Sequence, residues 1–392
     1  MYKVLTLNNI SVKGLERLPR DRYEVASEIA HPDVILVRSA DMHGMEIPPT
    51  VKAVARAGAG VNNIPVAELT RRGIPVFNAP GANANAVKEL VLAGMLLAAR
   101  NICQAWHYVR GLEGEEAAME REVEAGKKRF RGFELPGRTL GVIGLGAIGV
   151  QVANTALRLG MKVLGYDPQI TVERAWQLSS EVAQAHSPDD LVARSDFVTL
   201  HVPLTETTRH KINAERLALM RPGAVLLNFA RREIVDEEAV LAALDAGRLH
   251  AYVCDFPSPR IKDHPRVVAL PHIGASTVEA EENCAVMVAE QVRDWLENGQ
   301  VRNAVNFPEV QMPRAAGCPR LVVVNANIPN MLGQISTDLA EAGLNIADMI
   351  NKSRGEIAVT LVDVEGEIPP EVIERIGAID GVLSVRLIPA AA

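Results

Sequence analysis

The chain has 392 residues, of which 48% are hydrophobic and 23% charged, and its formal net charge is −7. This length is too great for one hydrophobic core, so it predicts two or three domains. The negative charge argues against nucleic acid or an anionic membrane as the main partner, although a locally basic pocket could still bind a small anion. Apolar runs stop well short of the roughly 18 residues that a membrane-spanning helix needs, and the four cysteines form no CxxC pair. We therefore expect a cytoplasmic protein with no signal peptide, membrane segment or metal site.

The first hundred residues alternate short β-branched runs with helical patterns. VLTL, DVILVRS, VKAVARAG and IPVFNAP end at or beside Gly, Pro, Asn or Ser, which is typical of buried parallel strands. An apolar helix is expected over ANAVKELVLAGMLLAAR, and the polar stretch from Leu112 to Arg131 has helical spacing.

A second α/β series begins at Thr139, with strands expected in TLGVIG, KVLGYD, DFVTLHV, AVLLNFA, AYVCDF and VVALPH. A helix from about Thr277 to Asn298 then leads the chain back to the first domain. FPEVQMPRAAGCP has three prolines and is typical of a linker. The rest of the chain predicts a small β-α-β-β-α-β unit. The fold class is therefore α/β, with two Rossmann-like or flavodoxin-like doubly wound domains and a C-terminal βαββαβ domain.

A phosphate-binding loop is predicted in GVIGLGAIGV, where Gly144, Gly146 and Gly149 follow a strand and open a helix. The first glycine permits the tight turn, the second lets backbone approach a pyrophosphate, and the third lets helix and strand pack closely. Asp167 ends the next strand, where a carboxylate can bind ribose hydroxyls and repel a 2′-phosphate. Pro168 follows it and no arginine stands beside it, so the pattern favours NAD over NADP.

Several polar residues follow predicted strands, where the ligands of an open α/β sheet collect. Arg231 could bind a carboxylate by two parallel hydrogen bonds, whereas its neighbours Arg232 and Glu233 fit a surface pair better. His272 in PHIGAST is a candidate acid or base. In the first domain the candidate substrate residues are Arg38, Ser39, Arg56 and Asn83. Two arginines are more than one carboxylate needs, which points to a second anion such as phosphate.

The segments LPGRTLGVIGLGAIG, GYDP, HVPLTETTRHKI, LLNFARREIVDEEAV, CDFP and PHIGAST occur in the order seen in NAD-dependent D-2-hydroxyacid dehydrogenases. The chain resembles this family over most of residues 1–307, and its C-terminal unit resembles an ACT domain, an amino-acid-sensing module. GANANAVKELV, DFP and EENCA are similar to the short-form members that oxidise 3-phospho-D-glycerate. The resemblance implies NAD-dependent oxidation of 3-phospho-D-glycerate to 3-phosphohydroxypyruvate, the first step of L-serine biosynthesis.

The resemblance also implies a domain plan. Residues 1–96 and 285–307 would bind substrate, 97–284 would bind NAD, 308–319 would be the linker and 320–392 the regulatory ACT domain. The active site would lie in the cleft between the first two domains.

The resemblance further assigns roles to single residues. His272 matches the general acid/base and Arg231 the arginine that binds the substrate carboxylate. Asp255 matches an aspartate that approaches the nicotinamide amide. Backbone at the pyrophosphate is matched by Ala147 and Ile148, and the adenosine side by Val202 and Pro203. Arg38, Ser39, Arg56 and Asn83 match substrate-side positions, and Lys127, Lys128 and Arg129 lie where relatives place basic residues that reach a neighbouring subunit.

Two positions depart from the family pattern. Arg232 stands where a glycine usually follows the catalytic arginine, and SPRIKDHP stands where many relatives carry a glutamate that pairs with the histidine. The imidazole of His272 would then be oriented by Asp263, by backbone or by water.

In the C-terminal unit, Asn325, Asn327 and Asn345 lie at turns, where short amides often satisfy only local backbone. The resemblance implies that they bind an effector, L-serine, which would inhibit a homodimer or homotetramer. Two alternatives remain open. One is another D-2-hydroxyacid dehydrogenase, a glyoxylate or hydroxypyruvate reductase, and the other is a non-catalytic NAD-sensing scaffold.

Overall fold

The amino-terminal sheet has five parallel strands in the order β2-β1-β3-β4-β5, which is the flavodoxin-like order. Its strands are β1 (Tyr2–Leu7), β2 (Tyr23–Ala26), β3 (Val34–Val37), β4 (Ala53–Arg56) and β5 (Val76–Phe77). The helices packed with it are α1 (Val12–Leu15), α2 (Val66–Arg71) and the long α11 (Val278–Asn298). All four side chains of β3 are buried, as expected for a strand covered on both faces.

The second sheet has seven parallel strands in the order β12-β11-β10-β9-β6-β7-β8. Counted from β6 this is the Rossmann order, in which the direction of strand addition reverses between β6 and β9. The strands are β6 (Thr139–Ile143), β7 (Lys162–Tyr166), β8 (Ala183–Gln184), β9 (Phe197–Leu200), β10 (Ala224–Asn228), β11 (Leu249–Cys254) and β12 (Val267–Ala269).

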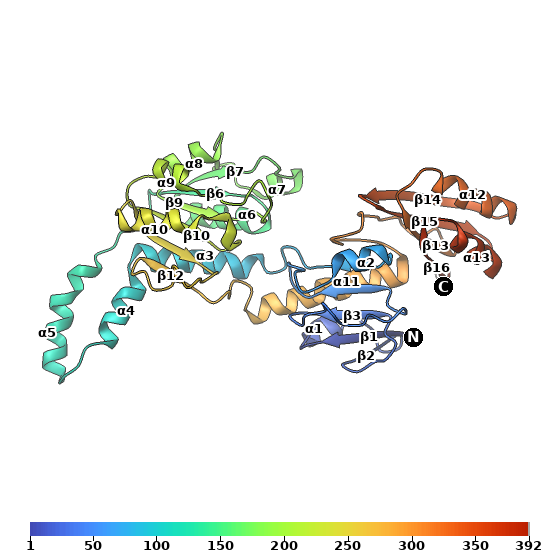
Figure 1. Cartoon of the computed structure of the whole chain (residues 1–392), viewed down its shortest axis with the longest axis horizontal. Coiled ribbons are helices and arrows are strands. Elements are labelled where there is room, and N and C mark those ends of the chain that lie inside the picture. The colour runs from blue at the N-terminus through green and yellow to red at the C-terminus, as the bar shows by residue number, and fades with distance from the viewer. Residues whose placement is uncertain (391–392) are drawn as a thin grey trace. The chain divides into compact units, whose positions relative to one another are not determined.

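The helices of this part are α3 (Ala84–Ala99), α4 (Ile102–Arg110), α5 (Glu116–Gly126), η1 (Lys127–Phe130), α6 (Ala147–Arg158), α7 (Val172–Gln177), α8 (Pro188–Arg194), α9 (Ala214–Leu219), η2 (Arg232–Ile234) and α10 (Glu237–Asp245). Helices α4 and α5 project from the sheet, and none of the side chains of α4 is buried (Figure 1).

The C-terminal segment forms a four-stranded antiparallel sheet in the order β14-β15-β13-β16. Along the chain its elements are β13 (Arg320–Ala326), α12 (Met331–Glu341), β14 (Asn345–Arg354), β15 (Ile357–Glu365), α13 (Pro370–Ala378) and β16 (Val382–Ile388). The predicted β-α-β-β-α-β sequence of elements is therefore present.

The computed structural model describes residues 1–390 and divides the chain into two units. The first unit comprises Met1–Asn83 and the chain from Val278 onward, and the second comprises Ala84–Thr277. The predicted boundaries after residues 96 and 284 fall inside α3 and α11. The roles assigned to the parts stay predictions.

Within the first unit, the C-terminal sheet shares a hydrophobic core with α11 and the amino-terminal sheet. Residues 308–319, expected to form a linker, contain no helix or strand, yet Val310, Met312 and Cys318 are buried. This connection is packed against its surroundings because its apolar side chains join the core.

Three arginines cap the end of α11. Arg386 donates to the carbonyl oxygens of residues 295 and 296 at 2.7 and 3.4 Å, Arg314 to that of residue 297 at 3.3 Å, and Arg320 to that of residue 298 at 3.0 Å. The last carbonyls of a helix have no partner within the helix and carry its negative dipole end, so cations are favoured there. The C-terminal sheet is thus bound to α11 by charge-assisted hydrogen bonds.

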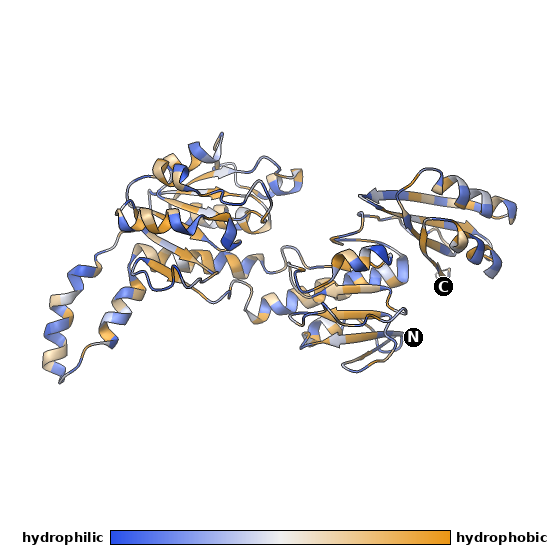
Figure 2. Cartoon of the chain, in the orientation of Figure 1, coloured by the Kyte–Doolittle hydropathy of each residue, from blue (hydrophilic) through white to orange (hydrophobic). Residues whose placement is uncertain are grey.

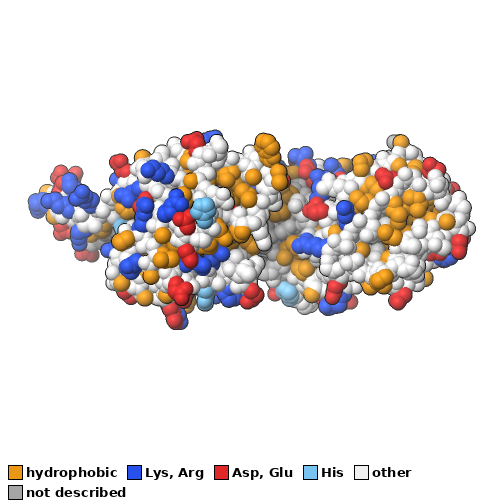
Figure 3. Space-filling model, turned by 90° about the horizontal axis from the view of Figure 1, so that it is seen from above, with side chains coloured by type: hydrophobic (Ala, Val, Ile, Leu, Met, Phe, Trp, Pro, Cys, Tyr) orange, Lys and Arg blue, Asp and Glu red, His pale blue; other side chains and the backbone are white. Residues whose placement is uncertain are grey.

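Most expected elements are present, including α3, α11 and a helix within the polar stretch after Leu112. The short strands β2 and β8 were not expected, since YEVA and AQ carry little strand signal. The strands are predominantly hydrophobic, and many surface helices are amphipathic (Figure 2). Acidic and basic side chains are interspersed over the face in Figure 3. In the part that the structure describes, no helix is long and apolar enough to cross a membrane.

Candidate active site

A cavity of about 390 Å³ lies in the second unit where β6 and β9 end. Open α/β sheets bind ligands at such a reversal of strand order, because the connecting loops diverge there. Val202, Pro203 and Asp167, predicted on the cofactor side, all line it. The full lining is Ile143, Gly144, Gly146, Tyr166, Asp167, Pro168, Gln169, His201, Val202, Pro203, Thr205, Thr207, Thr208 and Lys211.

The glycine loop has the geometry that a pyrophosphate site requires. Gly144 has φ +94°, and a Cβ there would lie 2.4 Å from the carbonyl oxygen of His201. A Cβ on Gly149 would lie 1.9 Å from the carbonyl oxygen of Gly144, so the helix and loop pack too closely for any side chain. A Cβ on Gly146 would meet nothing within 4 Å, which leaves its backbone open to a ligand.

Helix α6 begins directly after this loop, and no side chain caps its first turn. Its amide groups at Ala147 and Ile148 can therefore donate to an anion. The residues present fit a dinucleotide.

Asp167 is fixed at the edge of the same cavity. One carboxylate oxygen accepts from the Leu145 amide at 2.8 Å and the other from the Gln169 amide at 2.9 Å. The carboxylate is thereby held as an acceptor for ribose hydroxyls. The structure also brings Lys211 into the lining, with its ammonium 6.0 Å from the centre of the Tyr166 ring. Burial lowers the pKa of Lys211, and the nearby Arg216 adds to this effect.

His201 is a further residue of this cavity that the sequence did not single out. Its Nε2 lies 2.9 Å from the hydroxyl of the buried Thr199. Burial lowers the pKa of the imidazole to about 3, so the ring is neutral at physiological pH. Lys211 and His201 both belong to the segment HVPLTETTRHKI, which resembles the dehydrogenase family. Their place in this segment is the sequence feature that could have pointed to them.

Arg231, Asp255 and His272 lie beyond the carboxyl ends of three neighbouring parallel strands, β10, β11 and β12. Parallel strands end at the same edge of a sheet, so this edge collects all three residues. The side chain of Arg231 is exposed and donates to the Ala230 carbonyl at 2.6 Å. Arg232 and Glu233 pair with each other at 3.5 Å, as expected for surface residues.

Asp255 and Asp263 have different surroundings, and neither accepts a hydrogen bond from the ring of His272. Asp255 is 2% exposed and is absent from the lining of the cofactor cavity. Both of its carboxylate oxygens accept from backbone amides just after His272. Asp263, suggested as the acid that orients His272, pairs instead with Lys262 at 2.5 Å and is 79% exposed. Within residues 1–390, the ring of His272 makes no hydrogen bond and packs on Phe256.

The predicted substrate-side residues Arg38, Ser39, Arg56 and Asn83 belong to the first unit, and Arg38 and Arg56 meet there. Arg56 donates from Nε to the carbonyl of Arg38 at 2.9 Å and from Nη1 to that of Gly60 at 2.8 Å. The guanidinium of Arg38 forms an ion pair with Glu281 on the first turns of α11. The two arginines thus lie together at one sheet edge, and the carboxylate of Glu281 pairs with Arg38.

Ser39 is exposed, and its amide donates to the Asn8 side chain at 3.2 Å. Asn83 is partly buried immediately before α3. Of the basic residues expected near a neighbouring subunit, Lys127 pairs with Glu124 and Arg129 stacks 4.4 Å from the Tyr108 ring centre.

The three asparagines of the C-terminal sheet differ in their surroundings. Asn327 donates to the Gly355 carbonyl at 3.0 Å and Asn345 to Glu365 at 2.8 Å, both at the surface. Asn325 is buried and donates to the Ala326 carbonyl at 2.7 Å, but its Oδ1 has no hydrogen-bond partner among the described residues.

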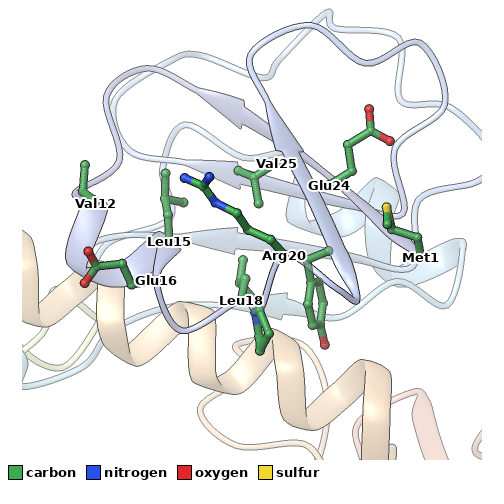
Figure 4. Close-up of a pocket in the computed structure, with 10 residues that line it drawn as sticks. Met1, Val12, Leu15, Glu16, Leu18, Arg20, Glu24 and Val25 are labelled. Atoms are coloured by element: carbon green, nitrogen blue, oxygen red, sulfur yellow. The ribbon is translucent and has the colours of Figure 1, made fainter.

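A cavity of about 700 Å³ lies in the first unit beside α1 (Figure 4). Met1 and Arg20, which line it, precede β1 and β2, so it faces the amino ends of these strands. Ligands of open α/β sheets bind at the carboxyl ends, so this position does not favour a role in catalysis. Among the described residues, no group of three His, Cys, Asp or Glu side chains could hold a metal ion.

Residues 92–274 match the family described as "D-isomer specific 2-hydroxyacid dehydrogenase, NAD binding domain". The chain is 35% identical over 357 residues to D-3-phosphoglycerate dehydrogenase of Haemophilus influenzae, a match that covers 88% of this chain and 83% of that protein. It is 38% identical over 350 residues to the enzyme of the same name from Methanocaldococcus jannaschii, and this match covers 87% of this chain. The chain spans only 63% of the length of that relative.

The solved structure of NAD+-bound 3-phosphoglycerate dehydrogenase from Entamoeba histolytica is similar to this chain, with a TM-score of 0.61 and 28% identity. The similarity covers 78% of this chain and 98% of that structure.

Proposed function

Because the chain belongs to the D-isomer-specific 2-hydroxyacid dehydrogenase family, we propose that it oxidises 3-phospho-D-glycerate to 3-phosphohydroxypyruvate with NAD. The observation that carries this proposal is the arrangement of Arg231, Asp255 and His272 at one edge of the sheet that contains the glycine loop. The substrate is taken from the names of the relatives. This reaction would open L-serine biosynthesis, and the four free cysteines fit a cytoplasmic location.

The reaction removes a hydride from C2 and a proton from its hydroxyl, leaving a carbonyl. Bound NAD supplies the acceptor for the hydride. His272 would take the hydroxyl proton as general base, which typically contributes about 10²–10⁴-fold to the rate. Arg231 would hold the carboxylate by paired hydrogen bonds and so fix the orientation of C2.

The phosphate would be bound from the first unit. Arg38 and Arg56 lie together there, and Glu281 forms an ion pair with Arg38. A guanidinium has five N–H donors, so Arg38 can bind a phosphate while it keeps Glu281. This cationic site favours a phosphorylated acid over glyoxylate or hydroxypyruvate.

The test is a His272→Gln variant, assayed for NAD reduction with 3-phosphoglycerate. We expect kcat to fall by about 10²–10⁴-fold while the Kd for NAD is unchanged, because the histidine lies outside the dinucleotide cavity. Unchanged turnover would remove His272 from the mechanism. Comparison of kcat/KM for phosphorylated and unphosphorylated 2-hydroxy acids decides between the substrates, and a complete lack of activity would favour the NAD-sensing scaffold.

We further propose that the C-terminal βαββαβ segment is an ACT domain that binds L-serine. The unpartnered Oδ1 of the buried Asn325 supports this, because a buried acceptor without a donor is costly unless a ligand supplies one. The ammonium group of serine is such a donor. Calorimetric titration with serine should give heat that an Asn325→Ala variant abolishes and a Gln334→Ala variant keeps. Absence of heat from protein that still binds NAD would contradict this role.

A homodimer or homotetramer is also proposed, with α4 at the contact. Ile102, Trp106 and Val109 of this helix are large, apolar and exposed, Trp106 to 60%. Sedimentation analysis should show that Trp106→Ser lowers the mass of the assembly. If the variant keeps the mass of the unaltered chain, the contact lies elsewhere.

A further inference from the structure

The loop that carries His272 has an unusual backbone conformation. It follows β12, and the Leu270 amide donates to the Cys254 carbonyl at 2.8 Å. His272 itself has φ +55°, in the left-handed region that side chains with a Cβ rarely adopt. Such a conformation persists only when its surroundings hold it. Some part of the structure must therefore fix this loop.

Asp255 supplies the fixing contacts. Its Oδ1 accepts from the Ile273 amide at 2.9 Å and its Oδ2 from the Gly274 amide at 2.8 Å. The carboxylate is almost fully buried, and hydrogen bonds to a buried ionised acceptor are the strong kind. A Cβ on Gly274 would lie 3.1 Å from Oδ2, so the absence of a side chain there permits the close approach.

The next residue contacts the imidazole. The ring of Phe256 lies 4.9 Å from that of His272, centre to centre, with 48° between the planes. The dipeptide Asp255-Phe256 thus contacts both the ring of His272 and the backbone that directly follows it.

The same network reaches Arg231. The buried Asn228 donates from Nδ2 to the main-chain carbonyl of Arg231 at 2.9 Å. The main-chain carbonyl of Asn228 accepts from the Asp255 amide at 3.2 Å. A continuous series of hydrogen bonds therefore runs from the backbone of Arg231 through Asn228 and Asp255 to the loop of His272.

We propose that Asp255 is a positioning residue for His272 and acts through the amides of Ile273 and Gly274. It replaces a carboxylate in direct contact with the imidazole, and the inference rests on the proposed function of His272 as the base. This role differs from the one expected for Asp255, contact with the nicotinamide amide.

The experiment is a double-mutant cycle between Asp255→Asn and His272→Gln. Asparagine has the same shape, but its nitrogen cannot accept from the second amide. We expect Asp255→Asn to lower kcat by about 10- to 100-fold, since a small misplacement of a reacting group has this effect. The Kd for NAD should stay the same, and the variant should cause no further loss in the His272→Gln background. Asp263→Asn removes the same charge on the neighbouring loop and should leave kcat unchanged.

An equal loss in both backgrounds together with a weaker Kd for NAD would overturn the proposal and assign Asp255 to the cofactor. Amide hydrogen exchange at Ile273 and Gly274 tests the contact without any substrate, and it should be faster in Asp255→Asn. Unchanged exchange would refute the contact even if the protein acts on another acid.

Gly274→Ala provides a second variant in case Asp255→Asn does not fold. Its methyl group would press on Oδ2, so kcat should fall while NAD binding is kept. An unaltered kcat in this variant would also count against the proposal.

Discussion

Replacing Asp363 with asparagine removes the counter-charge of a guanidinium that is fully enclosed in the first unit. Arg320 and Asp363 are both 0% exposed. Nε and Nη2 of Arg320 donate to the two carboxylate oxygens at 2.6 and 2.8 Å. The remaining donors reach the carbonyls of residues 298, 312 and 313 at 3.0, 2.9 and 2.8 Å. Every N–H of the guanidinium is therefore used.

The expected loss follows from this geometry. Asparagine leaves the buried cation uncompensated and turns one acceptor into a donor, while the Ala315 amide also depends on that carboxylate. Breaking such a pair typically costs about 3–5 kcal/mol. With a urea m-value of about 3 kcal/mol/M, the unfolding midpoint of the first unit should fall by about 1–2 M.

Trp295 can report on this unit. It is buried there, and the chain has three tryptophans, so Trp106→Phe and Trp176→Phe leave Trp295 as the one tryptophan. Glu290→Gln is the matched control, because the 3.7 Å ion pair of Glu290 with Arg17 is exposed on the same unit. Its loss should lower the free energy of unfolding by less than about 0.5 kcal/mol. The reasoning is refuted if Asp363→Asn lowers the free energy of unfolding by less than about 1 kcal/mol.

Three further predictions concern charge. The pKa of His201 is lowered to about 3 by burial, so between about pH 6.5 and 3 the unfolded state binds a proton that the folded state does not. The free energy of unfolding should therefore fall as the pH drops through this range, by at most about 1.4 kcal/mol per pH unit. His201→Gln should flatten this part of a denaturation–pH series. Asp167→Ser should raise kcat/KM for NADP relative to NAD by about tenfold, or ~1.4 kcal/mol, because Lys211 remains in the cavity; an unchanged ratio would show that the carboxylate does not select the cofactor. Glu281→Gln frees the charge of Arg38, so KM for 3-phosphoglycerate should fall by up to about fivefold with kcat unchanged, whereas a higher KM would mean that Glu281 mainly orients the arginine.

Local patterns were enough to predict much of the fold. Strand runs bounded by turn residues located most of the parallel strands, because buried strands are continuously apolar. The spacing of Gly144, Gly146 and Gly149 predicted the loop at β6, since Gly144 and Gly149 meet local steric needs that the structure shows and Gly146 leaves the backbone open. Asp167 was predicted at a strand end, and it directly follows β7.

The two short strands β2 and β8 were missed because their pairing depends on neighbouring strands rather than on their own residues. Arg320 and Arg386 lie in strands where a sequence pattern assigns charge to solvent. Their positive charge is instead taken up by Asp363 and by helix carbonyls. Glu281 lies 243 positions from Arg38, so no local pattern could pair them.

The sequence by itself was enough to name His272 and Arg231 as candidate catalytic residues and to predict which loop can receive a dinucleotide. Only the tertiary structure decided what holds His272. The sequence left Asp263, backbone or water as candidates, and the structure places the Asp255 carboxylate against the two main-chain amides that follow His272. Every residue except proline carries such an amide, so its use as a partner leaves no trace in the sequence and depends on where the neighbouring strands bring the carboxylate.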